Sequence, residues 1–402
     1  MVTASRAGQE KIRDANNRKI LHLLMKEREL SKQEMAKLAG LSVPTVTSIV
    51  THLIEEGIVE EAGVAVSTGG RKPMITRFLP ESRYAFGVDF SSNHLTSSNK
   101  IKVILINFDA VIKQEVAFDY EDFRNVGEIM NHIRQVTKEM VRAHGIAGDK
   151  LLGIGISLPG TVNEKKKVLE MAPNLSPDLD LKDLHFKQYE KLFPFPLFVE
   201  NEANAAAFAE LLFGVAKKKR NLVYLSLNRG IGAGIVVRGH IYKGSKKRAG
   251  EVGHMTIESE GIVCTCGRKD CWEIYAASGA LIRNYNKNSE DKLKDTQEFR
   301  SKLESGDALA AETWDVFLDY LVRGINNIIL SFDPHYLIIG GEISEFGKTL
   351  LEPLKTRIFE QNTYYEKDDL EIMLSSFKEK ASMLGVALLP FQKLFYGDNK
   401  II

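Results

Sequence analysis

Residues 250–273, GEVGHMTIESEGIVCTCGRKDCWE, hold the densest group of chemistry-bearing side chains in the chain. The segment carries one imidazole and three thiols, those of His254, Cys264, Cys266 and Cys271. One histidine and three cysteines form a usual ligand set for structural zinc, and Gly267 permits the sharp turn that folds the loop back. Because four protein ligands leave no open coordination position, we expect Zn²⁺ here in a structural role. The alternative is three buried thiols beside an unrelated histidine.

The composition is that of a globular protein, with 44% hydrophobic and 27% charged residues among 402. This length suits two or three folded units. The N-terminus lacks the apolar run of a signal peptide, and no stretch approaches ~18 uninterrupted apolar residues. We therefore expect a cytoplasmic protein with no membrane partner. An odd, clustered set of cysteines in that compartment favours metal binding over disulfides.

The first 80 residues show the pattern of a winged helix-turn-helix. An amphipathic helix is expected over 17–27, after a polar start that is loose or a short helical arm. Ser31 and Glu34 form a capping box for a second helix that ends before Gly40, whose positive φ suits the tight turn. A third helix should begin at Ser42 or Val43 and run to about 56. Extended pieces on both sides of the Gly-rich, basic stretch 67–73 predict a β-hairpin wing.

This arrangement predicts DNA binding by a domain spanning 1–80. The small Ala36 lets the two helices approach, and Val46 with Ile49 anchors the second helix against the first. Residues 1–80 carry 12 Lys/Arg against 9 Asp/Glu, a weak basic bias that is compatible with DNA. The residues expected to contact DNA are Ser42, Pro44, Thr45, Thr47, Ser48 and His52 on the third helix, and Arg71 and Lys72 in the wing. The alternatives are a helical hairpin used for protein contact and, for Arg71, a merely exposed turn residue.

Beyond a linker at 80–82 the pattern becomes α/β. Strands are expected at 84–89, 101–107, 152–157, 197–199, 222–227, 235–237 and 336–339, with helices at 125–144, 202–213 and 308–331. The stretches 84–107 and 222–237 share a layout of strand, turn and strand, which suggests a duplicated, two-lobed fold. The short basic runs 217–220 and 246–248 are most simply solvated loops.

Several motifs together resemble the ROK family of bacterial repressors and sugar kinases. They are Ser67-Thr68-Gly69-Gly70-Arg71-Lys72-Pro73, Leu158-Pro159-Gly160, Ala172-Pro173-Asn174, the run Glu200–Ala207, Gly250–Met255, the cysteine motif ending in Trp272-Glu273, and Asp333-Pro334 leading into Gly340-Gly341. The resemblance covers essentially all of 17–395. Asn201–Asn204 and Gly253–Ile257 look most like the xylose repressors of Gram-positive bacteria. One departure is Asp270, where the family usually has glycine.

The resemblance implies an α/β fold with an N-terminal winged helix-turn-helix and a two-lobed, actin-like domain of the ROK sugar-kinase type. Lobe 1 would span 81–200 with a C-terminal helix at 381–402, and lobe 2 with the zinc motif would span 201–380. Matching motif positions place six residues in a sugar cleft: Asn174, Asn201, Glu202, Glu251, His254 and Glu273. Carboxylates and amides suit a ring of sugar hydroxyls, although each residue taken singly is more often a surface or capping group. His254 would bind metal through one ring nitrogen and face the sugar with the other.

Three departures from the family's kinases argue against phosphoryl transfer, which needs phosphate-cradling amides and a placed carboxylate base. Asp89 is followed by Phe90-Ser91-Ser92-Asn93-His94, without the glycines of the first phosphate turn. The second turn reads Asn228-Arg229-Gly230 and lacks the threonine. Glu202 replaces the usual aspartate base. No catalytic residue is therefore expected.

The resemblance thus implies a repressor of a carbohydrate operon, with xylose or a related monosaccharide as effector and operator DNA as partner. A homodimer or higher homo-oligomer would place two recognition helices in successive major grooves. Sugar closing the cleft between the lobes would release the DNA. The alternatives are an ATP-dependent sugar kinase, a regulator that senses another sugar, and regulation by a protein partner.

Overall fold

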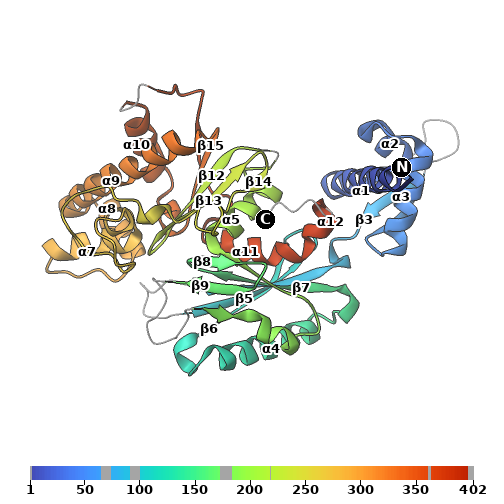
Figure 1. Ribbon diagram of the computed structural model, residues 1–402, viewed down its shortest axis with the longest axis horizontal. Helices are drawn as coiled ribbons and strands as arrows, with labels where there is room; N and C mark the ends of the chain where they lie inside the picture. Colours follow the sequence, from blue (N-terminus) through green and yellow to red (C-terminus); the bar gives the residue numbers. More distant parts are fainter. Residues whose placement is uncertain are drawn as a thin grey trace.

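The computed structural model describes residues 2–64, 74–90, 100–172, 183–217, 219–360 and 364–396, with the side chains of 2–11, Val64 and Tyr120 left out. The chain forms a small N-terminal head beside a larger body of two lobes (Figure 1). Within the described residues, no single helix is long and apolar enough to cross a membrane; α2 and α3, bent by 116°, pass that test only as a pair.

The head contains three helices and a three-stranded sheet of order β1-β3-β2. Its elements are α1 (Val2–Glu27), β1 (Glu29–Ser31), α2 (Lys32–Ala39), α3 (Val43–Glu55), β2 (Val59–Val64) and β3 (Met74–Phe78). Capping chemistry sets the helix boundaries. Ser31 Oγ accepts from the Glu34 amide at 3.2 Å while Glu34 Oε2 accepts from the Ser31 amide at 2.8 Å. Gly40 ends α2 with φ +62°, and Ser42 caps α3.

These observations confirm the predicted helix-turn-helix, including Val46 and Ile49 as buried anchors. The polar start is helical, one of its two expected forms, and it is continuous with the helix predicted over 17–27 in a single α1 that begins at Val2. One detail differs from the expectation. β1 was not foreseen: it pairs antiparallel with β3, which fixes the turn between α1 and α2 onto the wing.

The body is built on two five-stranded sheets with the same topology. Lobe 1 has the order β11-β7-β4-β5-β6 and lobe 2 the order β14-β13-β12-β15-β16. In each, three strands form an antiparallel meander, the first of them pairs in parallel with a later strand, and that strand pairs in parallel with a further one. The repeated layout noticed in the sequence is therefore a true structural duplication.

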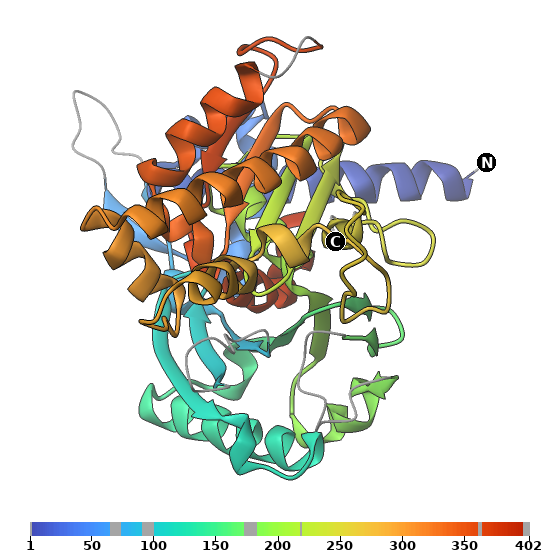
Figure 2. The same cartoon turned by 90° about the vertical axis from the view of Figure 1, so that its left-hand side faces the viewer.

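The strands of lobe 1 are β4 (Tyr84–Asp89), β5 (Lys100–Asn107), β6 (Ile112–Asp119), β7 (Leu151–Leu158) and β11 (Leu197–Asn201), with helix α4 (Val126–Ala143). A small antiparallel sheet of β8 (Thr161–Asn163), β9 (Val168–Met171) and β10 (Leu184–His185) follows β7. The strands of lobe 2 are β12 (Leu222–Leu227), β13 (Ile231–Val237), β14 (His240–Ile241), β15 (Tyr336–Gly340) and β16 (Glu371–Leu374). Its helices are α6 (Glu273–Ala276), α7 (Ser278–Asn288), α8 (Thr296–Glu304), α9 (Ala308–Phe332) and α10 (Lys348–Glu360). Figure 2 shows the lobe 2 helices above the sheet and helix of lobe 1.

Two helices, α5 (Glu202–Leu212) and α11 (Ala381–Leu388), pack against each other where the lobes meet. Their backbones touch without room for a side chain. A Cβ on Gly385 would lie 1.8 Å from the Ala205 carbonyl oxygen, and one on Gly155 of β7 would lie 1.9 Å from the Val386 carbonyl oxygen. The expected C-terminal helix over 381–402 is not continuous. Pro390 stands in a 3₁₀ turn between α11 and α12 (Gln392–Tyr396), and 397–402 lie outside the described residues.

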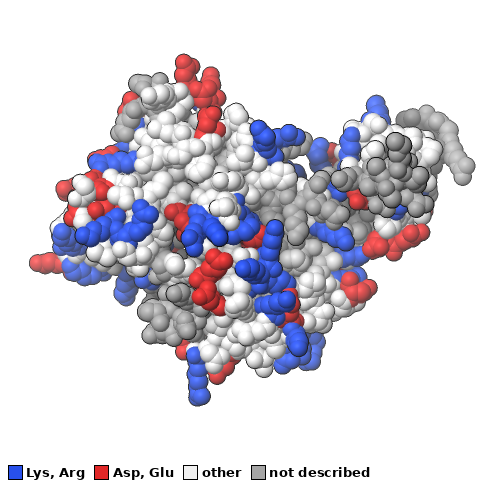
Figure 3. All heavy atoms as spheres, in the orientation of Figure 1, with Lys and Arg blue, Asp and Glu red and all other residues white. Residues whose placement is uncertain are grey.

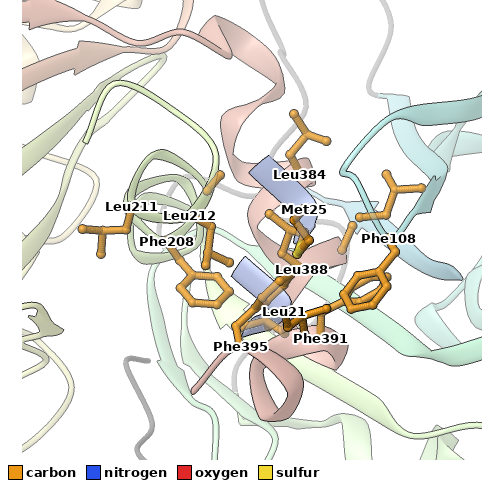
Figure 4. Close-up of a cluster of buried hydrophobic side chains, with 14 of the residues drawn as sticks. Leu21, Met25, Phe108, Phe208, Leu211, Leu212, Leu384, Leu388, Phe391 and Phe395 are labelled. Carbon is orange, nitrogen blue, oxygen red and sulfur yellow. The ribbon is translucent and has the colours of Figure 1, made fainter. Parts of the chain in front are cut away.

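One hydrophobic cluster joins the head to this junction. Leu21 and Met25 of α1 pack among side chains of α11, α12 and the β5–β6 turn, including Leu388, Phe395 and Phe108 (Figure 4). The Phe108 ring lies 5.2 Å from that of Phe391 and 5.7 Å from that of Phe395. The same cluster continues into α5 through Phe208 and Leu212 (labelled in Figure 4). Head and body therefore share one core.

We expect Phe395→Ala to detach the head from the body. Phe395 is 2% exposed, and removing a buried phenylalanine ring costs roughly 3–5 kcal/mol of unfolding free energy. Thermal unfolding should show a lower midpoint, and limited proteolysis should cut between head and body.

Tyr364→Ala is the matched control, because that aromatic ring is 84% exposed and its loss should cost under about 0.5 kcal/mol. Equal effects of the two substitutions would contradict a shared core.

Candidate functional site

The three thiols and one imidazole predicted from the sequence come together in space. One ligand atom from each of His254, Cys264, Cys266 and Cys271 lies within 4.8 Å of the others. Cys266 Sγ and Cys271 Sγ are 3.7 Å apart, and Cys264 Sγ is 3.8 Å from His254 Nδ1. A tetrahedral ion with bonds of about 2.3 Å to sulfur and about 2.0 Å to nitrogen requires ligand separations of about 3.5–3.8 Å. Two of the six separations therefore match those of a tetrahedral four-ligand site, and none of the others exceeds 4.8 Å.

The loop that carries the cysteines is shaped by its own backbone. The amide of Cys264 donates to the Arg268 carbonyl at 2.8 Å, and that of Gly267 donates to the Cys264 carbonyl at 2.9 Å. Gly267 has φ +84°, as its predicted turn requires. Asp270, at the position where glycine was expected from the family, also has positive φ, at +56°. Its carboxylate accepts from the amides of 261 and 262 and from the Tyr275 hydroxyl, which offsets the backbone strain.

Burial opposes ionisation of two of the three thiols. It raises the pKa of the Cys271 thiol to about 11 and also raises the pKa of the Cys264 thiol. A thiolate is the form that binds metal, so an ion would have to supply the compensating charge. Cys264 Sγ also donates to Glu273 Oε1 at 3.1 Å, which connects the cluster to a predicted sugar-binding carboxylate.

Three of the six predicted sugar-binding residues form a continuous chain beside the cluster. His254 Nδ1 lies 3.4 Å from Glu273 Oε1, and His254 Nε2 lies 4.0 Å from Glu251 Oε2. The Nδ1 side of the ring thus faces the thiols, and Nε2 faces away from them. Burial raises the pKa of Glu251, as does the nearby negative charge of Glu273, whereas the positive charge of His254 acts in the opposite direction.

Asn201 and Glu202 stand where β11 passes into α5. Asn201 Oδ1 caps α5 through the amides of 203 and 204, and its Nδ2 donates to the Gly160 carbonyl at 2.9 Å. The Asn201 side chain therefore holds two predicted motifs together. Glu202 is the first residue of α5 and faces β13, with its Oε1 4.0 Å from a Cβ built on Gly232. The neighbouring β13 residue, Ala233, donates its amide hydrogen to the Gly250 carbonyl. Strand β13 therefore contacts both the start of α5 and the segment that leads to Glu251. Asn174 lies outside the described residues.

Sequence reasoning missed a group of polar contacts around these residues. The Thr161 hydroxyl donates to Glu251 Oε1 at 3.2 Å. Lys243, the one buried lysine among the described residues, donates to Glu200 Oε2 at 2.6 Å. Lys247 pairs with Glu164 at 2.9 Å, so the run 246–248 is not simply a solvated loop. Sequence motifs marked Glu200 and Glu251 but gave no signal for their pairing, because the partners are far apart in sequence.

The predicted recognition helix presents a polar outer face. Pro44, Ser48 and His52, spaced four residues apart on α3, are exposed, whereas Val46, Ile49, Val50 and Leu53 are buried. Three other residues predicted to contact DNA make hydrogen bonds within α3 or its cap. The Ser42 hydroxyl is hydrogen-bonded to that of Thr45 at 2.8 Å, and the Thr47 hydroxyl donates to the Val43 carbonyl. Arg71 and Lys72 lie outside the described residues. Figure 3 shows basic and acidic side chains interspersed over the face in view, without a single-sign field.

The two turns compared with kinase phosphate loops are only partly described. Residues 91–99 lie outside the described residues, and Asp89 accepts from the Ser382 hydroxyl at 3.1 Å. In the second turn, Asn228 Oδ1 accepts from the Glu342 amide at 2.9 Å and would lie 2.6 Å from a Cβ on Gly341. The Asn228 side chain thus lies directly against the Gly340-Gly341 turn.

Comparison with known proteins agrees with this architecture. The family model described as "ROK family" matches residues 97–393. The chain belongs to the ROK family. A model described as "Winged helix-turn-helix DNA-binding" matches residues 13–60. The fold is therefore a winged helix-turn-helix joined to the two-lobed, actin-like domain of ROK proteins.

Curated relatives cover nearly the whole chain. The xylose repressor of Bacillus subtilis is 29% identical over 388 residues, 95% of this chain and 96% of that repressor. A putative xylose repressor of a Caldicellulosiruptor species is 30% identical over 401 residues, 96% of this chain and 98% of its own. The glucokinase of Halalkalibacterium halodurans is 27% identical but matches only 75% of this chain.

Among solved structures, too, a regulator covers more of this chain than a kinase does. A ROK family transcriptional regulator, a homologue of the Escherichia coli MLC protein, superposes with a TM-score of 0.77 at 24% identity, covering 96% of this chain and 97% of its own. A ROK glucokinase from Streptomyces griseus superposes with a TM-score of 0.64 at 23% identity and covers 76% of this chain but 98% of its own. These likenesses support the fold, and the regulator covers a larger share of this chain than the glucokinase does.

We expect Cys266→Ala to abolish metal binding. Purified protein should carry about one metal ion per chain by elemental analysis, and the variant close to none, because three ligands hold a structural ion far less tightly. Thermal unfolding of the variant should match that of chelator-treated protein.

Lys269→Ala, an exposed change in the same loop, should retain the metal. Full metal content in Cys266→Ala would show that the cluster does not bind the ion.

Proposed function

We propose that this chain is a DNA-binding transcriptional repressor of a carbohydrate operon that responds to a sugar, with xylose as the first candidate. One observation carries the proposal: a winged helix-turn-helix shares a hydrophobic core with a domain of the sugar-kinase type. Relatives named as xylose repressors match both parts over at least nine-tenths of the chain.

The DNA-binding surface would be the outer face of α3 with the wing. Ser42, Pro44, Thr45, Thr47, Ser48 and His52 would contact phosphates and base edges, with Arg71 and Lys72 on the backbone or in the minor groove. A homodimer would present two such helices to a pseudo-palindromic operator. The burial pattern of α3 supports this assignment, because one side of the helix, with Pro44, Ser48 and His52, is exposed while the opposite side is buried.

The sugar would bind between the lobes at Asn174, Asn201, Glu202, Glu251, His254 and Glu273. The contacts that tie Glu251, His254 and Glu273 to one another support this grouping, since they gather acceptors on one side of the cleft. The metal would be Zn²⁺, held by His254 and the three cysteines, and its role would be to fix the His254 ring with Nε2 towards the sugar. The same proposal includes three domains, which span 1–80, 81–200 with 381–402, and 201–380. It also includes a cytoplasmic location.

Coupling between sugar and DNA would pass through the junction of α5 and α11. Asn201 and Glu202 start α5, and α5 packs on α11, which leads through α12 to α1 of the head. A sugar that favours one lobe arrangement would thereby favour one head arrangement by the difference in its affinity for the two states. Release of DNA by sugar is the expected sign.

The proposal excludes sugar phosphorylation. Asn228 lies against Gly341 where kinases carry a phosphate-binding threonine turn, and Glu202 replaces the usual aspartate base. A coupled ADP assay with D-xylose, D-glucose and N-acetylglucosamine tests this, and turnover at ordinary kinase rates would favour the enzyme alternative.

The decisive experiment measures binding to a duplex selected from a random library, with and without D-xylose. We expect tight DNA binding that D-xylose weakens, and Glu273→Gln should retain DNA binding while losing the response. Losing one charged hydrogen-bond acceptor should weaken sugar binding by roughly tenfold or more.

Glu260→Gln, an exposed change near the same loop, is the matched control and should respond normally. A normal response in Glu273→Gln would remove that residue from the sugar site. Thermal-shift screening of other sugars separates a different effector from regulation by a protein partner, because a bound sugar raises the melting temperature.

Arg71→Ala should weaken DNA binding and leave sugar binding intact. Loss of one phosphate contact should reduce the slope of log affinity against log salt by about 0.9. Arg77→Ala is the control within the wing, because Arg77 is paired with Glu29 and Glu60 and is not among the predicted DNA contacts. Equal slopes for Arg71→Ala and the wild type would exclude a phosphate contact at Arg71.

A further inference from the structure

A pocket of about 340 Å³ lies on the outer face of the small β8–β10 sheet. In this sheet Val162, Leu169 and Leu184 pack into the core of lobe 1. Alternation along the strands turns the neighbouring side chains to the other face, where Thr161, Val168 and His185 line the pocket. The floor of the pocket is thus a sheet face of lobe 1.

Lobe 2 supplies the opposite wall through the loop 242–250, whose Arg248 lines the pocket. Three ion pairs fasten this loop to lobe 1. Lys243 pairs with Glu200 at 2.6 Å, and both side chains are buried. Lys243 and Lys247 also pair with Glu164, at 3.5 Å and 2.9 Å respectively. Within the loop, the Ala249 amide donates a hydrogen bond to the Lys243 carbonyl at 3.1 Å. Arg248 is therefore carried by a fixed loop at the lobe boundary.

The pocket adjoins the proposed sugar site. Thr161 lines it and donates its hydroxyl to Glu251 Oε1, and the Glu251 amide donates to the Arg248 carbonyl at 3.2 Å. A ligand held at Glu251 that extended past Thr161 would enter this space. Of the residues assigned to the sugar site, none of the five that the structure describes lines the pocket.

The chemistry of the lining suits a neutral, polyhydroxylated group. Lys166 and Arg248 supply donors, Glu170 and Asp183 supply acceptors, and their formal charges cancel. An anionic group would be repelled by the two carboxylates as much as it is attracted by the two cations. Val168 and Met171 add apolar surface of the kind that packs against the C–H face of a sugar ring.

We propose that this pocket is a second saccharide subsite, so that the effector is a disaccharide or the end of a longer oligosaccharide rather than a monosaccharide alone. The inference rests on the proposed sugar-sensing function and extends it. The first ring would occupy the site at Glu251, His254 and Glu273, and the second would lie over Val168 between Lys166, His185 and Arg248.

The test compares D-xylose with β-1,4-xylobiose by isothermal titration of the full-length, metal-loaded protein. We expect xylobiose to bind at least about tenfold more tightly, because only the disaccharide fills both subsites. Lys166→Ala and Arg248→Ala should each weaken xylobiose binding about fivefold or more and change xylose binding less than about twofold. Lys165→Ala is the matched control, since Lys165 is the adjacent exposed lysine and does not line the pocket.

The outcomes separate this proposal from the one on which it rests. If D-xylose binds and xylobiose binds equally or more weakly, the second subsite is wrong while sugar sensing stands. The same conclusion follows if Lys166→Ala and Lys165→Ala affect xylobiose alike, or if Arg248→Ala weakens both sugars equally. If neither sugar binds and no other sugar shifts the melting temperature, the sensing function itself is wrong and the subsite is overturned with it.

Discussion

The structure depends on the packing of α1 against the junction between the lobes. A helix-turn-helix of this size has little core of its own, and small units gain stability by sharing apolar surface with a neighbour. Here Leu21 and Met25 lie against α11 and α12, and the Phe108 and Phe395 rings complete the contact. Because the same cluster reaches α5, the head cannot shift without disturbing the helices at the lobe boundary. The position of the DNA-reading helix is thereby a property of the whole chain.

The proposed sugar site is organised by the opposite strategy, through polar contacts and a metal-ligand cluster rather than apolar packing. Between β14 and α6 the chain forms no long helix or strand, so the cysteine loop is held by its turns and isolated bridges. His254 belongs both to the ligand cluster and to the carboxylate chain with Glu251 and Glu273. A change in metal binding would consequently alter the shape of the proposed sugar site, because one imidazole ring belongs to both groups.

Features governed by local rules were predictable from the sequence. The capping box at Ser31 and Glu34, the turn at Gly40 and the ligand spacing of the cysteines depend on residues a few positions apart, and the structure has them as expected. Features governed by distant pairing were not. β1 has three residues and exists only because β3 lies beside it, and the ion pair between Lys243 and Glu200 joins residues 43 positions apart. The small β8–β10 sheet was missed for the same reason, since its strands are too short to show a period.

The glycine contact between α5 and α11 has a mechanical consequence. Where Gly385 meets the Ala205 carbonyl, two backbones touch, and no flexible side chain lies between them to absorb a displacement. If one lobe rotates against the other and this contact is kept, the contact acts as the pivot of the rotation. Because α12 and α1 extend away from this contact, a small rotation at the proposed sugar cleft would become a larger displacement of the proposed recognition helix.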